Sequence, residues 1–345
     1  MFSHNRRKLL QASGAILAAG AMSSPLRAQT AAPRVVVIGG GFAGATVAKY
    51  VRLWNPKIQV TLIEPNPNHV SCILSNLVMT GALGMTDITL RYDNLRTKYG
   101  VNIVADRAVA IDPVGRKVST QNGSQIAYDK LVLAPGIDFD AVPGLDSAVL
   151  PHAWQAGPQT LALKAQLQAV PSGGSFVMSI PLAPYRCPPG PYERACLLAD
   201  SLLRNRRAGK VIVLDANPDV VAEAHTFHTA FSTTYAGVIE YHPSTEVTSV
   251  DWANKTINTN WGPIRADAAN IIPRQKAGKL VAAAGLLGSA PGARWASVNP
   301  LSYESTLVPN VHVIGDSQGT GQPKSGHMAN AQAKVCADAL VRYFA

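Results

Sequence analysis

Residues 33–72 read PRVVVIGGGFAGATVAKYVRLWNPKIQVTLIEPNPNHVSC, and this segment indicates the class of the fold. A short apolar run (35–38) leads into a glycine-rich turn. A segment with helical apolar spacing follows and stops at Pro56, and a second apolar run (58–63) ends at Glu64. A strand, a glycine turn, a helix and a second strand in this order predict the βαβ unit of an α/β protein.

The glycine turn has the spacing G-x-G-x-x-G, which in a βαβ unit indicates a dinucleotide site. We expect Gly39 to make the tight turn, Gly41 to let the backbone approach a pyrophosphate, and Gly44 to let helix and strand close up. The free N–H groups and the dipole at the helix N-terminus favour phosphate. Glu64 is placed to accept hydrogen bonds from a ribose.

The first 32 residues predict an export signal. Arg6 and Arg7 precede a short apolar run (15–22), and a cleavage point follows Ala28, as in twin-arginine signals. This run is too short to span a bilayer, and no later stretch is long enough. We therefore expect a periplasmic protein, exported by a twin-arginine-type signal and not membrane-spanning.

Composition and charge limit the classes of function that remain possible for this chain. The chain has 345 residues, 47% of them hydrophobic, which is enough for two domains. Its formal net charge is +10, but no run of Lys and Arg with interleaved aromatics suggests a nucleic acid partner. The histidines lack metal-ligand spacing and C-x-x-C-H is absent, so we expect no metal and no haem in this chain.

A second α/β unit follows the first. Its expected elements are a helix at 159–169, a strand at 175–180, a helix at 192–207, and a strand at 211–214 that leads to Asp215. Where a phosphate loop should stand, residues 181–191 read PLAPYRCPPGP. Proline has no N–H to offer a pyrophosphate, so we expect no NAD(P) to bind there and another donor to supply the electrons.

Three tracts resemble the flavoprotein subunit of flavocytochrome c sulfide dehydrogenase. They are CILSN at 72–76, PYRCPPGPYERA at 184–195, and the C-terminal GD at 315–316 followed by PKSGHMANAQAK at 323–334. That family is grouped with sulfide:quinone oxidoreductases and glutathione-reductase-type flavoproteins. The resemblance implies FAD, oxidation of sulfide or a related sulfur compound, and electron delivery to a separate cytochrome c subunit or carrier.

The resemblance also implies an architecture of two dinucleotide-binding, Rossmann-like domains of the glutathione-reductase type. Residues 33–150 and 270–345 would form the FAD-binding domain, and residues 151–269 the second nucleotide-fold domain, without a phosphate loop. Because the sequence stops at Ala345, we expect the family's C-terminal interface domain to be largely absent.

The resemblance assigns roles to particular residues. Cys72 matches the cysteine that links the flavin covalently, although an ordinary buried cysteine is the alternative. Cys187 matches one half of a redox-active disulfide whose other half lies in the absent segment. Glu193 matches a nearby acid that could move protons, or is simply a glutamate favoured in a helix first turn.

The resemblance and the positions of these residues give one set of expected FAD contacts. Asp316 would bind ribityl hydroxyls, and the helix beginning near Ser325 would direct its N-terminus at the flavin pyrimidine ring. The residues that we expect to bind FAD are Gly39, Gly41, Phe42, Ala43, Gly44, Glu64, Cys72, Ala134, Pro135, Gly136, Gly315, Asp316, Lys324, Ser325 and Met328.

The state of the remaining thiols is a separate prediction. We expect Cys187 to be a free thiol with a lowered pKa, because Arg186 and a helix N-terminus are close in sequence. Cys336 should be a packed helix cysteine, and Cys196 could approach Cys187 only if their Cα atoms lie within bridging range. Two alternative functions stay open: a sulfide:quinone oxidoreductase, and a non-catalytic flavin-binding partner of a sulfur-oxidation system.

Overall fold

The computed structural model describes residues 31–345, of which Pro33 to Ala345 form one compact unit. The predicted export signal, residues 1–32, lies outside the described residues except for its last two positions. Between residues 31 and 345, no helix combines the length and the apolar character needed to cross a bilayer.

The first sheet is parallel throughout and contains the predicted βαβ unit. Its order is β19-β9-β1-β2-β5. These strands are β1 (Arg34–Ile38), β2 (Gln59–Ile63), β5 (Asn102–Val104), β9 (Lys130–Leu133) and β19 (Val311–Val313). Helix α2 (Phe42–Trp54) connects β1 to β2, as predicted, and Asn55 is its C-cap.

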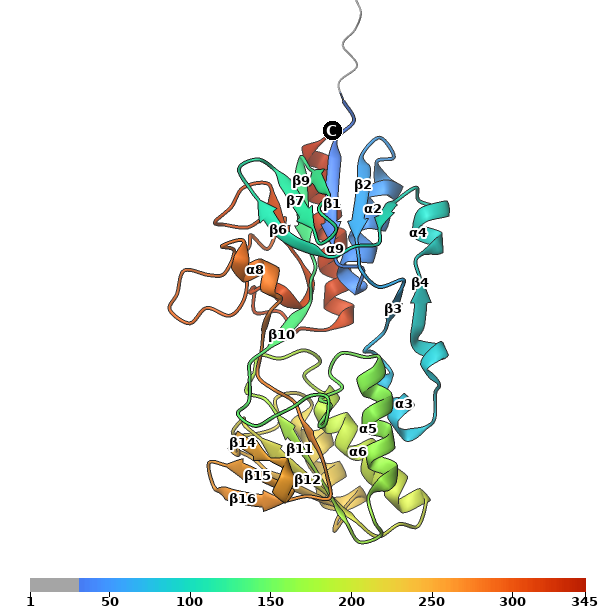
Figure 1. Cartoon of the computed structure of the whole chain (residues 1–345), viewed down its shortest axis with the longest axis vertical. Helices are drawn as coiled ribbons and strands as arrows, with labels where there is room; N and C mark the ends of the chain where they lie inside the picture. The colour runs from blue at the N-terminus through green and yellow to red at the C-terminus, as the bar shows by residue number, and fades with distance from the viewer. Residues whose placement is uncertain (1–30) are drawn as a thin grey trace, which may run out of the picture. The chain divides into compact units, whose positions relative to one another are not determined.

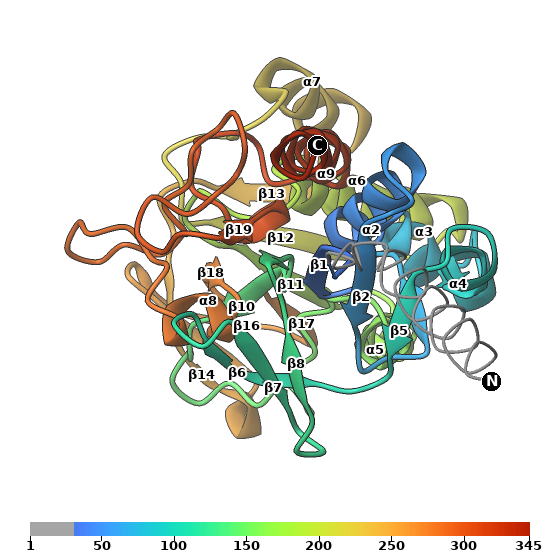
Figure 2. The same ribbon diagram turned by 90° about the horizontal axis from the view of Figure 1, so that it is seen from above.

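Helices cover one face of this sheet and a smaller sheet covers the other (Figure 2). Val35 and Val37 pack with α2 and α9 (Gly326–Tyr343), and Cys336 of α9 is fully buried there. Val36 and Ile38 point the other way, toward α8 (Lys279–Ala283) and an antiparallel sheet. That sheet is formed by β6 (Ala108–Asp112), β7 (Lys117–Thr120) and β8 (Gln125–Ala127). Strand β8 pairs antiparallel with β7, whereas β9, which follows β8 in the chain, pairs parallel with β1.

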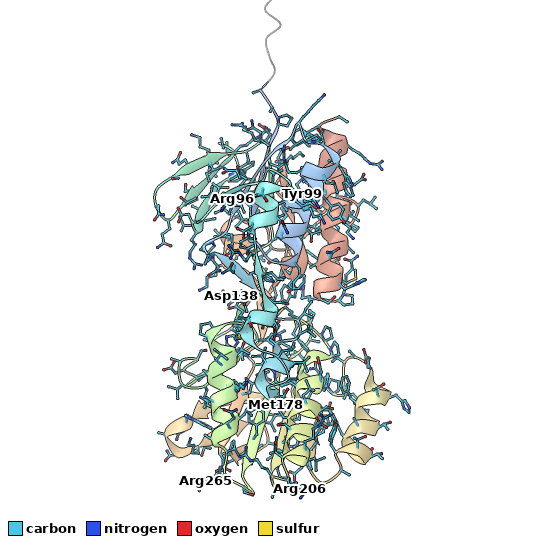
Figure 3. All side chains as sticks on the ribbon, turned by 90° about the vertical axis from the view of Figure 1, so that its right-hand side faces the viewer. Arg96, Tyr99, Asp138, Met178, Arg206 and Arg265 are labelled. Atoms are coloured by element: carbon cyan, nitrogen blue, oxygen red, sulfur yellow. The ribbon has the colours of Figure 1, made fainter. Side chains whose placement is uncertain are left out.

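A second parallel sheet has the order β13-β12-β11-β17. Its strands are β11 (Ser175–Ile180), β12 (Lys210–Asp215), β13 (Ile239–His242) and β17 (Ala268–Ile271). Phe176 and Met178, the latter labelled in Figure 3, face a core shared with the helices α5 (Pro158–Ala169), α6 (Gly190–Arg204) and α7 (Ala224–Thr229). Val177 faces the antiparallel sheet of β14 (Val247–Asp251), β15 (Thr256–Thr259) and β16 (Gly262–Arg265).

Helix α6 differs from its predicted range. It begins at Gly190 rather than residue 192, and it ends at Arg204 rather than residue 207. Pro191 therefore sits in the first turn, where a missing N–H costs no helical hydrogen bond. The proline tract, residues 181–191, thus forms the loop after β11 and also the first two residues of α6.

Two crossing segments join the regions of the two parallel sheets. Strand β10 (Ile137–Phe139) pairs antiparallel with β18 (Gln275–Ala277), and β10 lies between the two sheets in Figure 1. Between β2 and β5 lie β3 (Asn68–Val70), α3 (Ser75–Thr80), β4 (Thr89–Arg91) and α4 (Asp93–Thr97). The α/β class is confirmed, whereas the domain boundaries and the absent interface domain stay predictions.

Candidate functional site

The glycine turn closes the carboxyl end of β1. Gly39 has a φ of +96°, and a side chain there would collide with the carbonyl oxygen of Ala134 at the end of β9. A side chain on Gly44 would collide with the carbonyl oxygen of Gly39, so α2 packs directly on the turn. Both glycines therefore have the structural roles that the sequence predicts.

Gly41 faces open space beside the first turn of α2. An added Cβ would meet only Cε1 of His69, 3.7 Å away. No side chain caps the helix at Gly41, the N-cap position, which leaves the N–H groups of the first turn available to a phosphate. Phe42 and Ala43 form this turn, so their backbone lies where the prediction needs it.

The Glu64 carboxylate at the end of β2 is held in place by backbone and side-chain donors. Its Oε2 accepts a hydrogen bond of 2.7 Å from the N–H of Gly40. Its Oε1 accepts bonds of 2.9 and 2.7 Å from the N and Nδ2 of Asn66. Oε1 already accepts two hydrogen bonds, but Oε2 accepts only one, so this fixed carboxylate can still accept from a ribose hydroxyl through Oε2.

A cleft of about 690 Å³ contains the glycine turn, Glu64 and Cys72 in its wall. This volume is typical of a cofactor site. The predicted FAD-binding residues that line it are Gly39, Gly41, Glu64, Cys72, Ala134, Pro135 and Gly136. His69 also lines the cleft, and its buried Nε2 has no hydrogen-bond partner among the described residues. A buried polar atom without a partner fits a polar ligand, so these residues fit FAD.

Cys72 lies half-buried between β3 and α3. The Ser75 hydroxyl donates a hydrogen bond of 2.7 Å to the carbonyl oxygen of Cys72, and Leu74 adopts a left-handed conformation with φ +69°. The tract 72–76 is therefore a fixed bend at the start of α3. Glu64 and Cys72 line the same cleft, as a dinucleotide that reaches from one to the other requires.

Cys187 sits in a tight bend before α6. Its φ is +58°, its N–H donates a hydrogen bond of 2.6 Å to the carbonyl oxygen of Lys324, and its own carbonyl accepts one of 2.8 Å from the N–H of Gly190. An added Cβ on Gly190 would lie 2.8 Å from Sγ of Cys187. The bend thus holds the thiol between the start of α6 and the segment that precedes α9.

The prediction of a lowered thiol pKa is wrong. Burial, together with the charges of Cys72 and Glu193, raises the pKa of Cys187 to about 11, and the opposing effects of the Gly190 N–H and of Arg186 are smaller. Arg186 directs its guanidinium at the carbonyl oxygen of Trp154 and at Asp316, whose Oδ2 lies 3.8 Å from Nη1. Because the Arg186 guanidinium interacts with Trp154 and Asp316, burial has the largest effect on the pKa of Cys187.

The thiols are all free in this structure. Burial raises the pKa of the Cys196 thiol to about 12, and it raises that of the fully buried Cys336 as well. Cys336 has the packed position that the sequence predicts. The absence of a bond between Cys187 and Cys196 agrees with the expected free thiol.

Glu193 is exposed in the first turn of α6, and it meets the CILSN tract. Nδ2 of Asn76 lies 3.4 Å from Oε2 of Glu193 and 3.3 Å from the carbonyl oxygen of Gly190. Oδ1 of Asn76 accepts a hydrogen bond of 2.9 Å from Nε of Arg194. Two tracts that are far apart in the sequence are therefore joined by one amide side chain.

The C-terminal members of the predicted site gather around the start of α9. The Ser325 hydroxyl caps the helix by accepting from the N–H of Met328 at 3.2 Å. An added Cβ on Gly326 would lie 3.4 Å from the ring of Phe42, and one on Gly315 would lie 3.1 Å from Cβ of Ala43. The start of α9 therefore packs against the first turn of α2, next to the cleft.

Asp316 and Lys324 face inward at this position. Burial raises the pKa of Asp316, while the charges of Arg186 and Lys324 oppose that rise. Nζ of Lys324 donates to the carbonyl oxygens of Asp316 and Gln318 at 2.8 Å and lies 3.5 Å from the ring centroid of Trp295, and burial lowers its pKa to about 8. Asp316 does not itself line the 690 Å³ cleft, but it forms an ion pair with Arg186, which does.

The carboxylate of Asp215, at the end of β12, accepts four hydrogen bonds from neighbouring residues. Asp215 is completely buried, and its Oδ2 accepts hydrogen bonds from the hydroxyls of Tyr192 (2.7 Å) and Tyr241 (2.9 Å). Its Oδ1 accepts from the N–H and Nδ2 of Asn217 at 2.9 and 2.7 Å. This position is where a nucleotide fold presents its ribose-binding acid.

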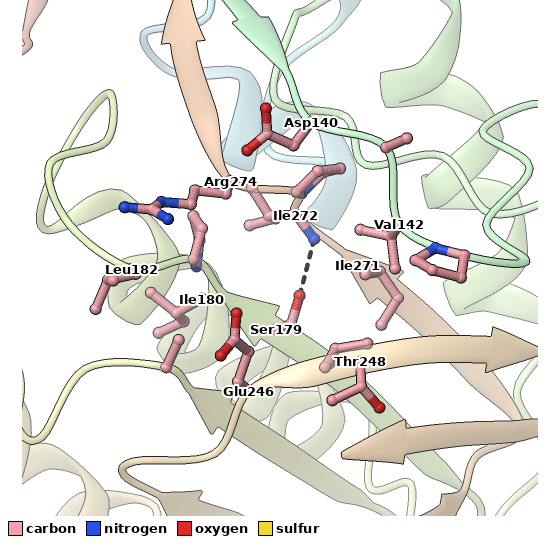
Figure 4. Close-up of a pocket in the computed structure, with 16 residues that line it drawn as sticks. Asp140, Val142, Ser179, Ile180, Leu182, Glu246, Thr248, Ile271, Ile272 and Arg274 are labelled. Atoms are coloured by element: carbon pink, nitrogen blue, oxygen red, sulfur yellow. Dashed lines mark hydrogen bonds between the residues drawn. The ribbon is translucent and has the colours of Figure 1, made fainter. Parts of the chain in front are cut away.

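A second cleft, of about 440 Å³, lies at the carboxyl ends of β11 and β17 (Figure 4). The Ser179 hydroxyl accepts a hydrogen bond of 3.0 Å from the N–H of Ile272 across these two strands. The strand order diverges between β11 and β17, which makes this the usual ligand position of an open parallel sheet. Arg274 and Glu246 are exposed in its wall.

Sequence reasoning missed Asn76, Arg194 and His69. The first two lie inside the tracts CILSN and PYRCPPGPYERA, so the motifs themselves were the available signal. His69 could be found only from its buried, unpaired nitrogen. Within residues 31–345, no group of three His, Cys, Asp or Glu side chains is arranged to hold a metal ion.

The chain matches two family profiles. The profile of the sulfide dehydrogenase (flavocytochrome c) flavoprotein chain, central, covers residues 160–273. The profile of pyridine nucleotide-disulphide oxidoreductases covers residues 33–169. Together they span both parallel sheets, except for β19.

Three known proteins are similar to the chain in sequence. The sulfide dehydrogenase (flavocytochrome c) flavoprotein chain of Chlorobaculum thiosulfatiphilum is 58% identical over 45 residues, which are 13% of this chain and 94% of that sequence. The sulfide-quinone reductase of Aquifex aeolicus is 34% identical over 105 residues, 30% of this chain and 24% of that protein. The mitochondrial sulfide:quinone oxidoreductase of Mus musculus is 21% identical over 317 residues, 87% of this chain and 69% of that protein.

Similarity of fold extends over almost the whole chain. The structure of the sulfide:quinone oxidoreductase from Aquifex aeolicus matches with a TM-score of 0.77 at 21% identity, covering 91% of this chain and 77% of that one. A water-forming NADH oxidase from Lactobacillus brevis matches with a TM-score of 0.70 at 20% identity, covering 90% of this chain and 69% of that one. The fold is thus shared with a sulfide:quinone oxidoreductase and with an NADH oxidase.

Proposed function

We propose that this chain, which belongs to the family of the sulfide dehydrogenase (flavocytochrome c) flavoprotein chain, is a periplasmic FAD-dependent oxidoreductase. It would oxidise sulfide, or a related sulfur compound, and pass the electrons to a separate cytochrome c subunit or carrier. The observation that carries this proposal is that Cys72 and Arg186, which precedes Cys187 in the chain, line one cleft together with the glycine turn and Glu64.

The residues around the 690 Å³ cleft would hold FAD. The N–H groups at the start of α2 would bind its pyrophosphate, and the fixed Glu64 carboxylate would bind its ribose. Cys72 would attach the cofactor covalently. When bound, FAD supplies a two-electron acceptor that can return electrons one at a time to a cytochrome.

Cys187 would receive the sulfur of the substrate. A thiol and one hydrosulfide ion combine to a persulfide with the loss of one proton and two electrons, for which bound FAD would be the acceptor. Because burial keeps this thiol protonated at neutral pH, a nearby base has to remove its proton. Glu193 is exposed, and its charge acts on Cys187, so it can carry the proton between the thiol and water.

The same chain would not use NAD(P)H. Two observations support this part of the proposal. The tract between β11 and α6 contains prolines where a phosphate loop has N–H donors, and the carboxylate of Asp215 is filled by two tyrosines and an asparagine. The donor would therefore be the sulfur substrate itself.

The electron acceptor distinguishes this proposal from its nearest alternative. Similarity to sulfide:quinone oxidoreductases argues for a quinone as the electron acceptor of this chain. Similarity to the flavocytochrome c flavoprotein chain argues for a cytochrome c. The test is steady-state sulfide oxidation by the purified, flavin-loaded chain with either acceptor. We expect turnover with cytochrome c. Turnover with a soluble quinone alone would assign the chain to the alternative, and turnover with neither would favour a non-catalytic partner.

A further inference from the structure

Arg194 on α6 is a buried cation that the chemistry described above does not use. Its residue is 2% exposed, and within the described part of the chain no carboxylate forms an ion pair with it. Its N–H groups donate instead to neutral oxygens: Oδ1 of Asn76 (2.9 Å), Oδ1 of Asn270 (2.7 Å), and the carbonyls of His152 (3.2 Å) and Ala153 (3.0 Å). These partners satisfy the donors but do not cancel the charge.

The guanidinium remains charged at neutral pH. Burial lowers the pKa of Arg194 to about 9, which still leaves it protonated, and the charges of Cys187 and Glu193 oppose that decrease. Glu193 is exposed to water, which screens its charge. Cys187 is therefore the buried neighbour at which an anion would gain most from Arg194.

One indole ring connects the two residues. The guanidinium carbon of Arg194 lies 4.6 Å from the ring centroid of Trp154. An added Cβ on Gly190 would lie 3.2 Å from Cη2 of the same ring and 2.8 Å from Sγ of Cys187. The cation, the indole and the thiol are thus consecutive neighbours, in a region from which water is largely excluded.

Arg194 also fixes the segment that carries Cys72. Its Nε orients the amide of Asn76, which lies four residues beyond Cys72, and the other end of that amide points at Gly190 and Glu193. The buried arginine therefore connects the bends that carry the two reactive cysteines. Replacing it affects both charge and geometry, so a test has to separate the two effects.

We propose that Arg194 is a positioning residue that stabilises the anionic sulfur formed at Cys187. This inference rests on the proposed function, in which Cys187 accepts sulfur from sulfide. The charged or titratable groups that act on Cys187 are Cys72, as long as its thiol is free, and Glu193, which disfavour a thiolate, and Arg186, which favours it weakly. Arg194 adds a buried positive charge: a Cys187 thiolate raises the pKa of Arg194, and the same attraction favours the thiolate.

The test follows alkylation of Cys187 by iodoacetamide in the full-length, flavin-loaded protein, with peptide mapping to read this cysteine alone. Arg194→Met removes the charge and keeps an unbranched apolar chain. We expect alkylation about tenfold slower than in the wild type at about pH 7.5, where Arg194 is still protonated, because a tenfold lower thiolate fraction reacts tenfold more slowly. Arg194→Lys keeps the charge, and its rate should stay within about threefold of the wild type.

Two further variants make the test decisive. Arg204→Met, on the exposed end of α6 where Arg204 pairs with Asp200, is the matched control and should react like the wild type. Asn76→Asp preserves the side-chain volume and places a carboxylate beside Nε of Arg194, so it should also slow alkylation about tenfold. If the circular dichroism spectrum shows that Arg194→Met is not folded, Asn76→Asp alone tests whether the charge of Arg194 acts on Cys187.

The proposal is overturned if folded Arg194→Met and Asn76→Asp are alkylated at the wild-type rate. It is also overturned if Arg194→Lys reacts as slowly as Arg194→Met, because hydrogen-bond geometry and not charge would then be responsible. The alkylation readout is independent of sulfide turnover. If the wild type oxidises no sulfide while alkylation depends on Arg194 as expected, the proposed function fails and the electrostatic role of Arg194 stands.

Discussion

The hydroxyl of Tyr192 donates a hydrogen bond of 2.7 Å to Oδ2 of Asp215, a carboxylate with no exposed surface. Asp215 ends the second strand of a nucleotide-type sheet, where a free acid would bind a ribose. The hydroxyl of Tyr241 and the side chain of Asn217 complete its set of partners. A ribose would have to displace buried hydrogen bonds to reach it, which is costly.

The first prediction concerns nicotinamide cofactors. We expect neither NADH nor NADPH to reduce the flavin rapidly, because the proline tract and the occupied Asp215 remove both ends of a binding site. Stopped-flow absorbance at the flavin band measures the rate, and dithionite serves as the positive control. Rapid bleaching by either nucleotide would contradict our interpretation of the second sheet.

The second prediction separates two glycines of the same turn. Gly41→Ala should fold normally but bind less FAD, since its Cβ enters the cleft and meets only Cε1 of His69 at 3.7 Å. Gly44→Ala should lower the free energy of unfolding by about 3 kcal/mol or more, because its Cβ collides with backbone. Thermal midpoints and flavin content of the two variants measure this. Equal flavin content in Gly41→Ala and wild type would contradict the assigned phosphate site.

The third prediction concerns cofactor attachment through Cys72. We expect the flavin to stay with the wild-type polypeptide after acid denaturation, and Cys72→Ser to release it while keeping the fold. Ser75 and Leu74 define this bend without using the thiol, so the variant should be stable. Intact mass under denaturing conditions gives the answer. A wild-type mass without added flavin would exclude the covalent link but leave bound FAD untouched.

The fourth prediction concerns pH. Burial raises the pKa of Cys187 to about 11 in the folded chain, so its thiol binds a proton more tightly there than in the unfolded chain. The contribution of Cys187 to stability is therefore present below about pH 8.5 and is lost as pH rises toward about 11. Over the same interval, alkylation of Cys187 should accelerate about tenfold per pH unit. A rate that levels off near neutral pH would mean that the pKa of Cys187 is lowered rather than raised, and would contradict this prediction.

Local features of the site follow from the sequence, and long-range ones do not. The positive φ at Gly39 and the contact of Gly44 are consequences of a short motif, so they could be predicted. The pKa of Cys187 could not, because it depends on burial by segments that are distant in sequence and on where Arg186 points. The bond between Asn76 and Arg194 joins residues 118 positions apart, which no local pattern indicates.

The same distinction applies to the second sheet. The missing phosphate loop could be read from prolines in the chain, since a proline lacks an N–H wherever it lies. The hydrogen bonds that Asp215 accepts could not be predicted, because they require Tyr192 and Tyr241 to converge on one carboxylate. The ends of the strands could be located from the sequence. The side chains that bond to the residues at those ends could not, because they come from distant segments.

The central claim is that sulfide reduces the flavin of this chain through Cys187. The most direct measurement is anaerobic addition of sulfide to the flavin-loaded protein while the flavin absorbance is followed. We expect bleaching in the wild type and in Cys336→Ser, whose thiol is packed in the core away from the cleft, and no bleaching in Cys187→Ser. Bleaching of Cys187→Ser at the wild-type rate would contradict the account.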